Sequence, residues 1–359
     1  MSRLLDLGPS GLTYAAAGVS IDAGDDAVRR ISATVASTNR PEVLGGIGGF
    51  GGLFHLDRER YYDPVLVASA DGVGTKLEIA RLVGRYDTVG LDLVAMLVDD
   101  LVCVGAEPLF LLDYVAVGSL DPARLEELVG GIAAGCRIAA TALLGGETAE
   151  HGGVMRPDDL DVAGFAVGVV ERGAQLGASR VESGDAIVGF ASPGLRSNGY
   201  SLARRVLLGE SGDPGDPSAL DRPAYEGATT SLGEELLRPS VIYAPAALAA
   251  LAAYPSAVHA IAHITGGGIV GNVARVLPAH LDAVIDLDTF ETPAIFFEIQ
   301  RRGPVSADEM VRVFNCGLGM TVVVDPEVAA DVVSIAKDLG VSASVVGRVE
   351  PGAGMVRLP

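Results

Sequence analysis

One short segment of this chain combines a carboxylate, two glycines and a cation in a pattern that could hold a phosphorylated ligand. It reads Asp-Gly-Val-Gly-Thr-Lys, from Asp71 to Lys76, and follows an apolar run at 64–71. A carboxylate at a strand end, followed by glycines and an ammonium group, is typical of a site for a metal-bound polyphosphate. The spacing is not that of a Walker A loop. A strand-to-helix turn with an incidental lysine is the alternative interpretation.

Further carboxylates lie where apolar segments end. Glu147 and Glu150 belong to Gly-Gly-Glu-Thr-Ala-Glu (145–150), at a predicted sheet edge of the kind where α/β folds bind ligands, although a capped turn is the alternative. Asp99 and Asp100 lie in the segment 87–105, which is apolar on nearly every helical face. A buried carboxylate needs a partner. This pair therefore predicts either a Mg²⁺ contact, or a salt bridge or nearby helix N-terminus.

A glycine-rich segment precedes these motifs. Residues 45–52 read Gly-Gly-Ile-Gly-Gly-Phe-Gly-Gly, with six glycines in eight positions. Such a segment lets the backbone approach a ligand closely and direct N–H groups at phosphate oxygens. Taken alone, it favours a flexible surface loop. Phe50 and Phe54 interrupt and flank it, which indicates that the loop docks onto something.

Two segments of the second half run into predicted helices. In Arg-Ser-Asn-Gly-Tyr-Ser (196–201), Ser197 and Asn198 are capping residues whose N–H groups would face a ligand, although capping alone also explains them. His-Ile-Thr-Gly-Gly-Gly (263–268) could hold a second phosphate in the same way. His259 and His263 share a strand face, and such histidines are more often core or surface residues than catalytic ones.

Strands and helices alternate around these motifs. We expect strands at 64–71, 108–117, 142–144, 161–171, 185–191, 258–263, 281–285, 319–324 and 343–349. We expect helices at 75–83, 87–105, 122–140, 197–208, 240–253, 268–277, 293–302, 307–314 and 327–339, and a surface loop at 209–223. Gly, Ser and charged residues interrupt the apolar runs at 172–185. The pattern predicts two α/β domains, residues 1–174 and 175–359.

Composition limits the classes of partner. The 359 residues carry a formal charge of −20, which argues against a nucleic-acid surface. Cys103, Cys136 and Cys316 are widely spaced, fit neither a disulfide framework nor a zinc site, and suit a reducing compartment. Acidic residues break the most apolar region, 89–117, so it cannot cross a bilayer, and the N-terminus lacks a signal-peptide stretch. We expect a cytoplasmic protein without membrane or nucleic-acid partners.

Read together, the segments closely resemble the phosphoribosylformylglycinamidine cyclo-ligase family, also called aminoimidazole ribonucleotide synthetases. The order and number of the matching stretches carry the resemblance, which runs nearly from end to end. They include YAAAGVSIDAG, RPEVLGGIGGFGGLF, DGVGTK, GLDLVAMLVDDLV, GAEPLFLLDY, GGETAE, DVAGFAVGVVE, SNGYSL, AHITGGG and EMVRVFNCGLGM.

The resemblance implies a fold and a reaction. Family members are homodimers whose N-terminal domains join their sheets into a shared β-barrel, with a C-terminal α/β domain that contains a mixed sheet. The reaction converts formylglycinamidine ribonucleotide and ATP to aminoimidazole ribonucleotide, ADP and phosphate, in purine biosynthesis. ATP and Mg²⁺ are the implied cofactors.

The resemblance also implies roles for particular residues. Asp71, Asp100 and Glu147 match the family's Mg²⁺–ATP carboxylates, and with Lys76 they form the expected catalytic set. The expected ATP-binding residues are Gly48, Gly49, Phe50, Gly51, Gly72, Gly74, Thr75 and Thr148. The expected substrate-binding residues are Arg196, Ser197, Asn198, Gly199, Thr265, Gly266 and Gly267.

Two departures from the family pattern leave alternatives open. Many relatives have histidine where this chain has Arg196, so an acid–base role of that histidine does not carry over, although a guanidinium could still bind phosphate. His151 replaces part of the usual Met-Pro-Gly and could supply a titrating group. The alternatives are a non-catalytic nucleotide-binding subunit or another ATP-using enzyme of the same fold. Selenophosphate synthetase is one, but no cysteine precedes Cys103.

Overall fold

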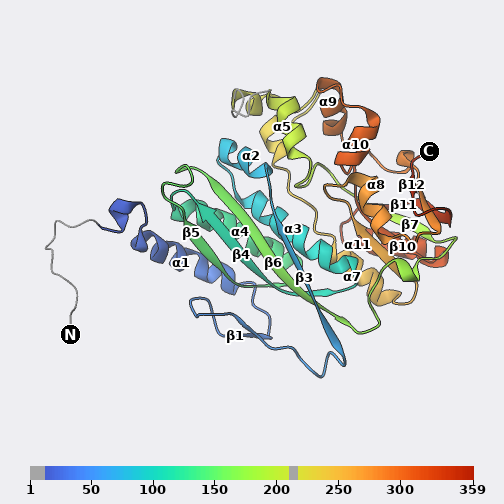
Figure 1. Ribbon diagram of the computed structural model, residues 1–359, viewed down its shortest axis with the longest axis horizontal. Helices are drawn as coiled ribbons and strands as arrows, with labels where there is room; N and C mark the ends of the chain where they lie inside the picture. Colours follow the sequence, from blue (N-terminus) through green and yellow to red (C-terminus); the bar gives the residue numbers. More distant parts are fainter. Residues whose placement is uncertain (1–12, 210–216) are drawn as a thin grey trace.

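The computed structural model of the protein describes residues 13–209 and 217–359, and each half of the chain contains one large sheet (Figure 1). The two-domain α/β class and the mixed sheet of the second half are thereby confirmed. The predicted loop 209–223 lies partly outside the described residues. Its described part includes a 3₁₀ helix, η3 (Pro217–Asp221).

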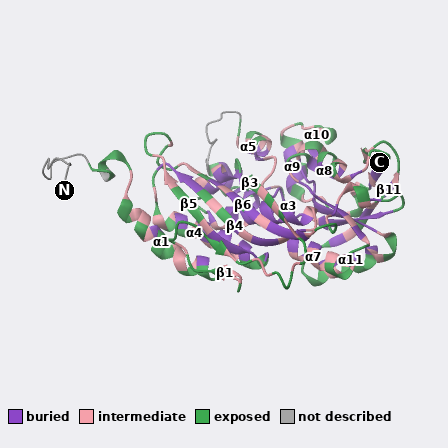
Figure 2. Cartoon of the chain, turned by 60° about the horizontal axis from the view of Figure 1, so that its bottom comes forward, coloured by how far each residue is buried: buried purple, intermediate pink, exposed green. Residues whose placement is uncertain are grey.

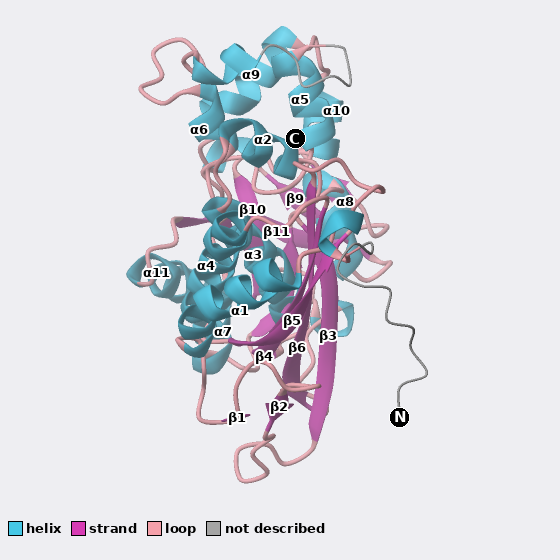
Figure 3. Ribbon diagram, turned by 90° about the vertical axis from the view of Figure 1, so that its left-hand side faces the viewer, coloured by secondary structure: helices cyan, strands magenta, loops and turns pink. Residues whose placement is uncertain are grey.

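The first half builds a four-stranded sheet. The strands lie in the order β3 (Pro64–Gly72), β6 (Leu160–Glu171), β4 (Glu107–Val117) and β5 (Ala142–Glu150). β6 is antiparallel to both neighbours, and β5 is parallel to β4. Helices α3 (Asp87–Cys103) and α4 (Pro122–Ile138) cover one face, and α1 (Ile21–Ala36) packs on α4 (Figure 3). Asp121 caps α4 by accepting the N–H groups of Ala123 and Arg124.

The other face of this sheet is apolar and open to solvent. Leu66 on β3 and Phe165 on β6 are 62% and 50% exposed, and Leu112 and Tyr114 on β4 are also exposed. The register aligns Phe165 with Leu112 across the centre of this face. A contiguous apolar surface of this kind is seldom left uncovered in globular proteins.

The second half builds a six-stranded mixed sheet. Its order is β12 (Val356–Arg357), β9 (Leu281–Ile285), β11 (Ala343–Pro351), β7 (Ala186–Ala191), β10 (Leu318–Val324) and β8 (Val258–His263). Only the β12–β9 pair is parallel. Figure 2 shows α7 (Ala244–Ala253) and α11 (Ala329–Asp338) on one side of this sheet. Helices α8 (Gly268–Val273), α9 (Ala294–Arg302) and α10 (Ala307–Val313) lie on the other.

Several element boundaries differ from the sequence prediction. The predicted strand 142–144 continues to Glu150, so Glu147 lies within β5 and not after its end. The helix predicted from residue 197 begins later, as α5 (Tyr200–Leu208), because Arg196 and Gly199 have positive φ angles of 63° and 75°. Elements without a prediction are α1, the short α6 (Leu232–Leu236), the ribbon β1 (Val43–Leu44) and β2 (Leu53–Phe54), and β12.

Helix α3 lies at the junction of the two halves. It packs against β3, β6 and α4 of its own half and against α7 and β8 of the second half. The apolar surface of α3 is thus covered jointly by the first and the second half of the same chain. Two of its carboxylates, Asp92 and Asp99, are fully buried there.

The Asp92 carboxylate forms a buried ion pair with Lys76, at the start of α2 (Lys76–Val83). The N–O distance is 2.5 Å, and both side chains have no solvent exposure. Lys76 Nζ also donates to the backbone carbonyls of Arg196 (3.0 Å) and Arg238 (2.8 Å) in the second half. Asp92 accepts the N–H and hydroxyl of Ser240. Burial lowers the pKa of Lys76, and the Asp92 carboxylate opposes that shift. Lys76 therefore holds the two halves together.

Replacing Lys76 by methionine is expected to destabilise the protein by about 3 kcal/mol, because it leaves the Asp92 carboxylate buried without its counter-charge. Denaturant unfolding measures the change. Lys337→Met is the matched control, since Lys337 is exposed and should tolerate the change. Equal stability of both variants would contradict the structural role.

Another carboxylate, Asp113, is half-buried on the helix-covered side of β4, between the buried residues Leu111 and Val115. Its Oδ1 occupies the space that a Cβ at position 146 would need, which explains why Gly146 stands beside it. Burial raises the pKa of Asp113 to about 7. Folding therefore binds a proton at this group between its ordinary pKa and about 7. Its contribution to stability is lost as pH rises through that window.

Asp113→Asn should remove this pH dependence. Relative to the parent protein, the variant should gain at least about 1 kcal/mol of unfolding free energy between pH 5 and pH 8. Urea unfolding at the two pH values measures the difference. A difference that is constant with pH would show that Asp113 titrates normally.

Candidate active site

Most of the predicted site residues fall into two separate groups within the chain. The first, called here the Asp71 cluster, comprises Asp71, Thr75, Asp100, Asn198, Ser201, His263 and Gly266. It lies where β3, α3, β8 and the turn 196–199 meet. The second, called here the β5-edge cluster, comprises Gly45–Gly52, Glu147 and Thr148.

Asp71 and Asp100 are neighbours in the Asp71 cluster. Asp71 Oδ1 accepts the N–H of Gly72 at 2.7 Å. Burial raises the pKa of Asp71 and the Asp100 carboxylate adds to that shift, while the Gly72 N–H opposes it. Two adjacent and solvent-accessible carboxylates suit a divalent cation that takes its other ligands from water and phosphate oxygens. Within the described residues, no group of three or more His, Cys, Asp and Glu side chains is gathered for a metal.

His263 connects Asp100 to the junction. Arg196 Nη2 lies 2.9 Å from His263 Nε2, and His263 Nδ1 lies 2.9 Å from Asp100 Oδ1. Because a guanidinium can only donate, Nε2 must accept and the proton must lie on Nδ1. His263 therefore donates to Asp100, which fixes the orientation of that carboxylate. Sequence reasoning treated His263 as a core or surface residue, and its strand-end position before Thr-Gly-Gly-Gly was the available signal.

Arg196 lies inside the protein, with a side chain that is 1% exposed. It pairs with Asp99 at 2.9 Å, donates to the Val241 carbonyl at 2.8 Å and lies 4.6 Å from the centre of the Tyr243 ring. The other Asp99 oxygen accepts the N–H groups of Tyr243 and Ala244, where α7 begins. Asp99 thus has the salt bridge and the helix N-terminus that the sequence allowed. This placement argues against direct contact between Arg196 and a phosphate.

The turn after Arg196 presents the next predicted substrate residues. Gly199 packs against Phe314 so closely that a Cβ would overlap the ring, and its φ of 75° also favours glycine. Ser197 Oγ is buried and lacks a hydrogen-bond partner among the described residues. A Cβ built on Gly266 would lie 3.6 Å from Asn198 Oδ1, so the two predicted substrate segments adjoin.

The segment Thr265–Gly267 is held by Asn272 of α8. Asn272 Nδ2 donates to the carbonyls of Thr265 (3.3 Å) and Gly268 (2.8 Å), and Thr265 Oγ1 donates to Asn272 Oδ1. On the opposite side of the cluster, Thr75 Oγ1 lies 3.3 Å from Ser201 Oγ, and Gly74 has a φ of 69°. These contacts give the backbone between β3 and α2 a defined shape next to Asp71.

The β5-edge cluster lies across the sheet from Asp71. The glycine-rich segment joins β1 to β2, and Gly52 lies against Leu144 of β5. The Phe50 side chain within it is fully exposed. Glu147 pairs with Tyr114, Tyr114 with Ala163, and Ala163 with Gly72. Three strand spacings separate Glu147 from the Asp71 strand, or about 14 Å. The fold of the single chain therefore does not bring Glu147 and Thr148 to Asp71 and Asp100.

Two other predicted features lie outside the Asp71 cluster. The Lys76 ammonium is fully buried among protein oxygens, which argues against direct phosphate contact. His151 Nε2 lies 3.2 Å from the Tyr114 hydroxyl at the open face of the first sheet.

Burial raises the pKa of the Cys103 and Cys136 thiols, and that of Cys316 to about 12, so none of the three is a ready nucleophile.

Both halves of the chain match known protein families, and solved structures share its fold. Residues 60–170 match the family described as AIR synthase related protein, N-terminal domain, and residues 182–357 match its C-terminal domain. Solved structures with the same fold include a thiamine-monophosphate kinase from Stenotrophomonas maltophilia (TM-score 0.65, 20% identity, 92% of this chain and 95% of that one). Another is the hydrogenase maturation protein HypE in complex with ATP (TM-score 0.60, 16% identity, 99% and 93%). At these identities the likeness shows the fold alone.

Relatives of much higher identity cover almost the whole chain. The phosphoribosylformylglycinamidine cyclo-ligase of Symbiobacterium thermophilum is 52% identical over 95% of this chain and 97% of its own length. That of Myxococcus xanthus is 51% identical over 96% and 97%. The motif order, both domain matches and this identity lead to one conclusion: the chain belongs to the phosphoribosylformylglycinamidine cyclo-ligase family.

Proposed function

We propose that this enzyme uses ATP to cyclise formylglycinamidine ribonucleotide to aminoimidazole ribonucleotide, with release of ADP and phosphate, in de novo purine biosynthesis. The observation that carries the proposal is the 52% identity to a cyclo-ligase over nearly the whole of both chains. The adjacent Asp71 and Asp100 carboxylates support a metal-bound triphosphate at the junction of the two halves. The domain boundary that we propose, between residues 174 and 175, falls between the end of β6 and the start of β7.

The chemistry requires an amide oxygen to become a leaving group. ATP would phosphorylate the formyl oxygen, and the amidine nitrogen would then attack that carbon and expel phosphate. We assign Mg²⁺ to Asp71 and Asp100, where it would neutralise charge on the triphosphate. The backbone at Gly72–Gly74 lies beside these carboxylates, and Asn198 and Thr265–Gly267 would orient the ribonucleotide. Positioning and charge neutralisation are the main tasks of such a site.

We further propose that the active enzyme is a homodimer whose first sheets face one another in a shared barrel. The open apolar face with Leu66, Phe165 and Leu112 supports this arrangement. The distance between Glu147 and Asp71 within one protomer supports a site completed by the partner. In that site the partner's β5-edge cluster would meet the Asp71 cluster, so that glycine amides and a third carboxylate surround one triphosphate.

We assign the enzyme to the cytoplasm, because its three cysteines are unpaired and purine synthesis uses cytoplasmic metabolites. Among the described residues, no helix is long and apolar enough to cross a membrane.

The primary test supplies the purified protein with ATP, Mg²⁺ and formylglycinamidine ribonucleotide and measures aminoimidazole ribonucleotide. Product is expected, and Asp71→Ala should lower kcat at least about 100-fold while the far-ultraviolet circular dichroism stays unchanged. No product at micromolar enzyme would favour a non-catalytic nucleotide-binding subunit. An active Asp71→Ala variant would mean that the metal assignment is misplaced.

A second test addresses the composite site. Asp71→Ala and Glu147→Ala protomers, each inactive alone, are co-expressed with different tags and allowed to pair. Half of the dimers then contain one of each protomer, and each mixed dimer holds one intact site. About a quarter of the parental activity should therefore return.

The control pairs Asp71→Ala with Asp100→Ala. Both changes lie in the same cluster, so each composite site in the mixed dimer carries one of them and activity should stay absent. If purified mixed dimers of the first kind are inactive, the partner does not complete the site.

A further inference from the structure

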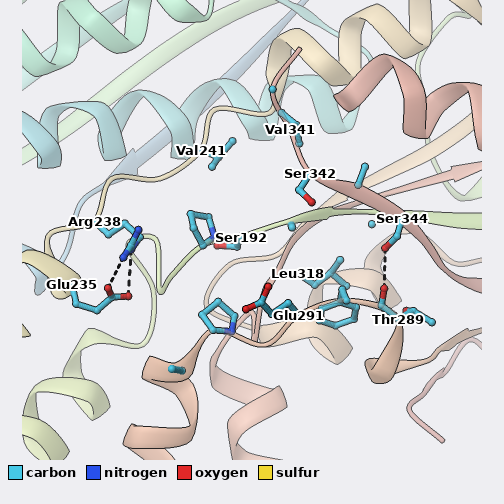
Figure 4. A pocket seen from close by; sticks show the side chains of 18 of the residues that line it. Ser192, Glu235, Arg238, Val241, Thr289, Glu291, Leu318, Val341, Ser342 and Ser344 are labelled. Carbon is cyan, nitrogen blue, oxygen red and sulfur yellow. Dashed lines mark hydrogen bonds and ion pairs between the residues drawn. The ribbon is translucent and has the colours of Figure 1, made fainter. Parts of the chain in front are cut away.

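A cavity of about 680 Å³ lies in the second half of the chain, and Ser192 and Pro193 are among the residues that line it. It is bounded by the end of β7, the loop before β11 and the start of α9 (Figure 4). Its volume is within the range of small-molecule sites. None of the residues predicted for ATP, metal or substrate lines it.

Three of the hydroxyl groups that line this cavity, those of Ser192, Thr289 and Ser344, donate their protons to backbone carbonyls. Ser192 Oγ donates to the Gly194 carbonyl at 2.8 Å, and Ser344 Oγ donates to the Thr289 carbonyl at 3.1 Å. Thr289 Oγ1 donates to the Asp286 carbonyl at 2.6 Å. Their remaining lone pairs can only accept. The cavity is therefore rich in hydrogen-bond acceptors.

The charged groups of the cavity also favour a ligand that donates hydrogen bonds or carries positive charge. Arg238 is paired with Glu235 through its Nε (3.3 Å) and Nη2 (2.6 Å), so these two charges offset each other (Figure 4). Glu291 lies between that pair and Thr289 in Figure 4. Across residues 13–209 and 217–359, the Glu291 carboxylate makes neither a hydrogen bond nor an ion pair. One uncompensated negative charge thus remains in the cavity.

The rest of the wall is apolar. Val241, Leu318 and Val341 contribute side chains, and Phe290 and Pro293 contribute flat surfaces. An apolar wall combined with a single carboxylate and acceptor hydroxyls suits a flat ligand that carries a cationic or donor-rich end.

The cavity is also connected to the active centre through the backbone. Arg238 and Val241 line it, and their carbonyls accept from Lys76 Nζ (2.8 Å) and Arg196 Nη1 (2.8 Å). Arg196 in turn orients His263 and, through it, Asp100. A shift of the segment 238–241 would therefore be felt at the carboxylates of the Asp71 cluster.

We infer that this cavity is a second ligand site, for a small flat molecule with an amine, amidine or exocyclic amino group, and that its occupation modulates the active centre through the segment 238–241. The inference that a ligand binds in this cavity is independent of the proposed function. The inference that its binding modulates the active centre rests on the proposed function.

Benzamidine is a suitable probe because it joins a flat apolar ring to a cationic, donor-only group, and benzoate is its anionic counterpart. Saturation-transfer NMR and calorimetry on the full-length protein should show benzamidine binding with a dissociation constant on the order of 1 mM. Benzoate should bind at least about tenfold more weakly. Equal binding of the two probes would overturn the assignment of ligand class.

Two variants locate the bound probe. Glu291→Gln should weaken benzamidine about tenfold, because it removes a charge-assisted hydrogen bond. Ser342→Phe should abolish binding by filling the cavity, since Ser342 lines it and is exposed. Glu327→Gln, an exposed carboxylate outside the cavity, is the control and should bind as the parent does. Undiminished binding in both cavity variants would overturn the site.

The effect of cavity occupation on the active centre is measured in a separate experiment, by enzyme kinetics. Saturating benzamidine should change the KM for ATP or kcat at least about twofold in the parent and leave the Ser342→Phe variant unaffected. Binding at the cavity without any change in either constant would overturn the coupling and leave the site. If the protein lacks cyclo-ligase activity altogether, the binding experiments still decide whether the site exists, so the two failures are distinguishable.

Discussion

Two buried ion pairs on one helix hold this molecule together. Asp92 of α3 pairs with Lys76 of the first half, and Asp99 pairs with Arg196 of the second half, both without solvent contact. Lys76 and Asp92 in turn bind the backbone of Arg238 and Ser240 in the second half. A buried charge is costly unless its partner and its remaining hydrogen bonds are all present. Here Ser240, Tyr243 and Ala244 supply the remaining donors. The relative position of the two sheets, and hence of every residue in the Asp71 cluster, depends on this arrangement.

The same arrangement explains which parts of the site could be read from the sequence. The apolar runs predicted most strands to within a residue or two, because a strand buried on one or both faces leaves a clear hydrophobic pattern. Asp71, Asp100, Asn198 and Gly266 were singled out by motifs, and they lie close together. Helix α1 has Gly24 and several aspartates in its first turns, which hid its amphipathic pattern.

The roles of the cations could not be read in this way. Lys76 and Arg196 follow or lie within ligand-like motifs, yet their side chains turn inward toward α3. No local pattern separates a cation that faces a phosphate from one that faces a buried carboxylate more than a dozen residues away. The extension of β5 through Glu147 was missed for a related reason. Glycines at 145 and 146 suggested a turn, whereas Gly146 is there to make room for the Asp113 carboxylate of the neighbouring strand.

The buried contacts between α3 and the second half also limit which parts of the molecule can move during turnover. Hinge bending between the sheets would break the buried Asp99–Arg196 salt bridge and the hydrogen bonds of Lys76 and Asp92 to the second half, so it is a poor route for admitting reactants. Conformational freedom is left to the solvent-facing ribbon tip around Phe50, whose glycines impose little steric restriction. Among the described residues, any movement that admits reactants is therefore expected in the glycine-rich segment 45–52 and not between the two sheets.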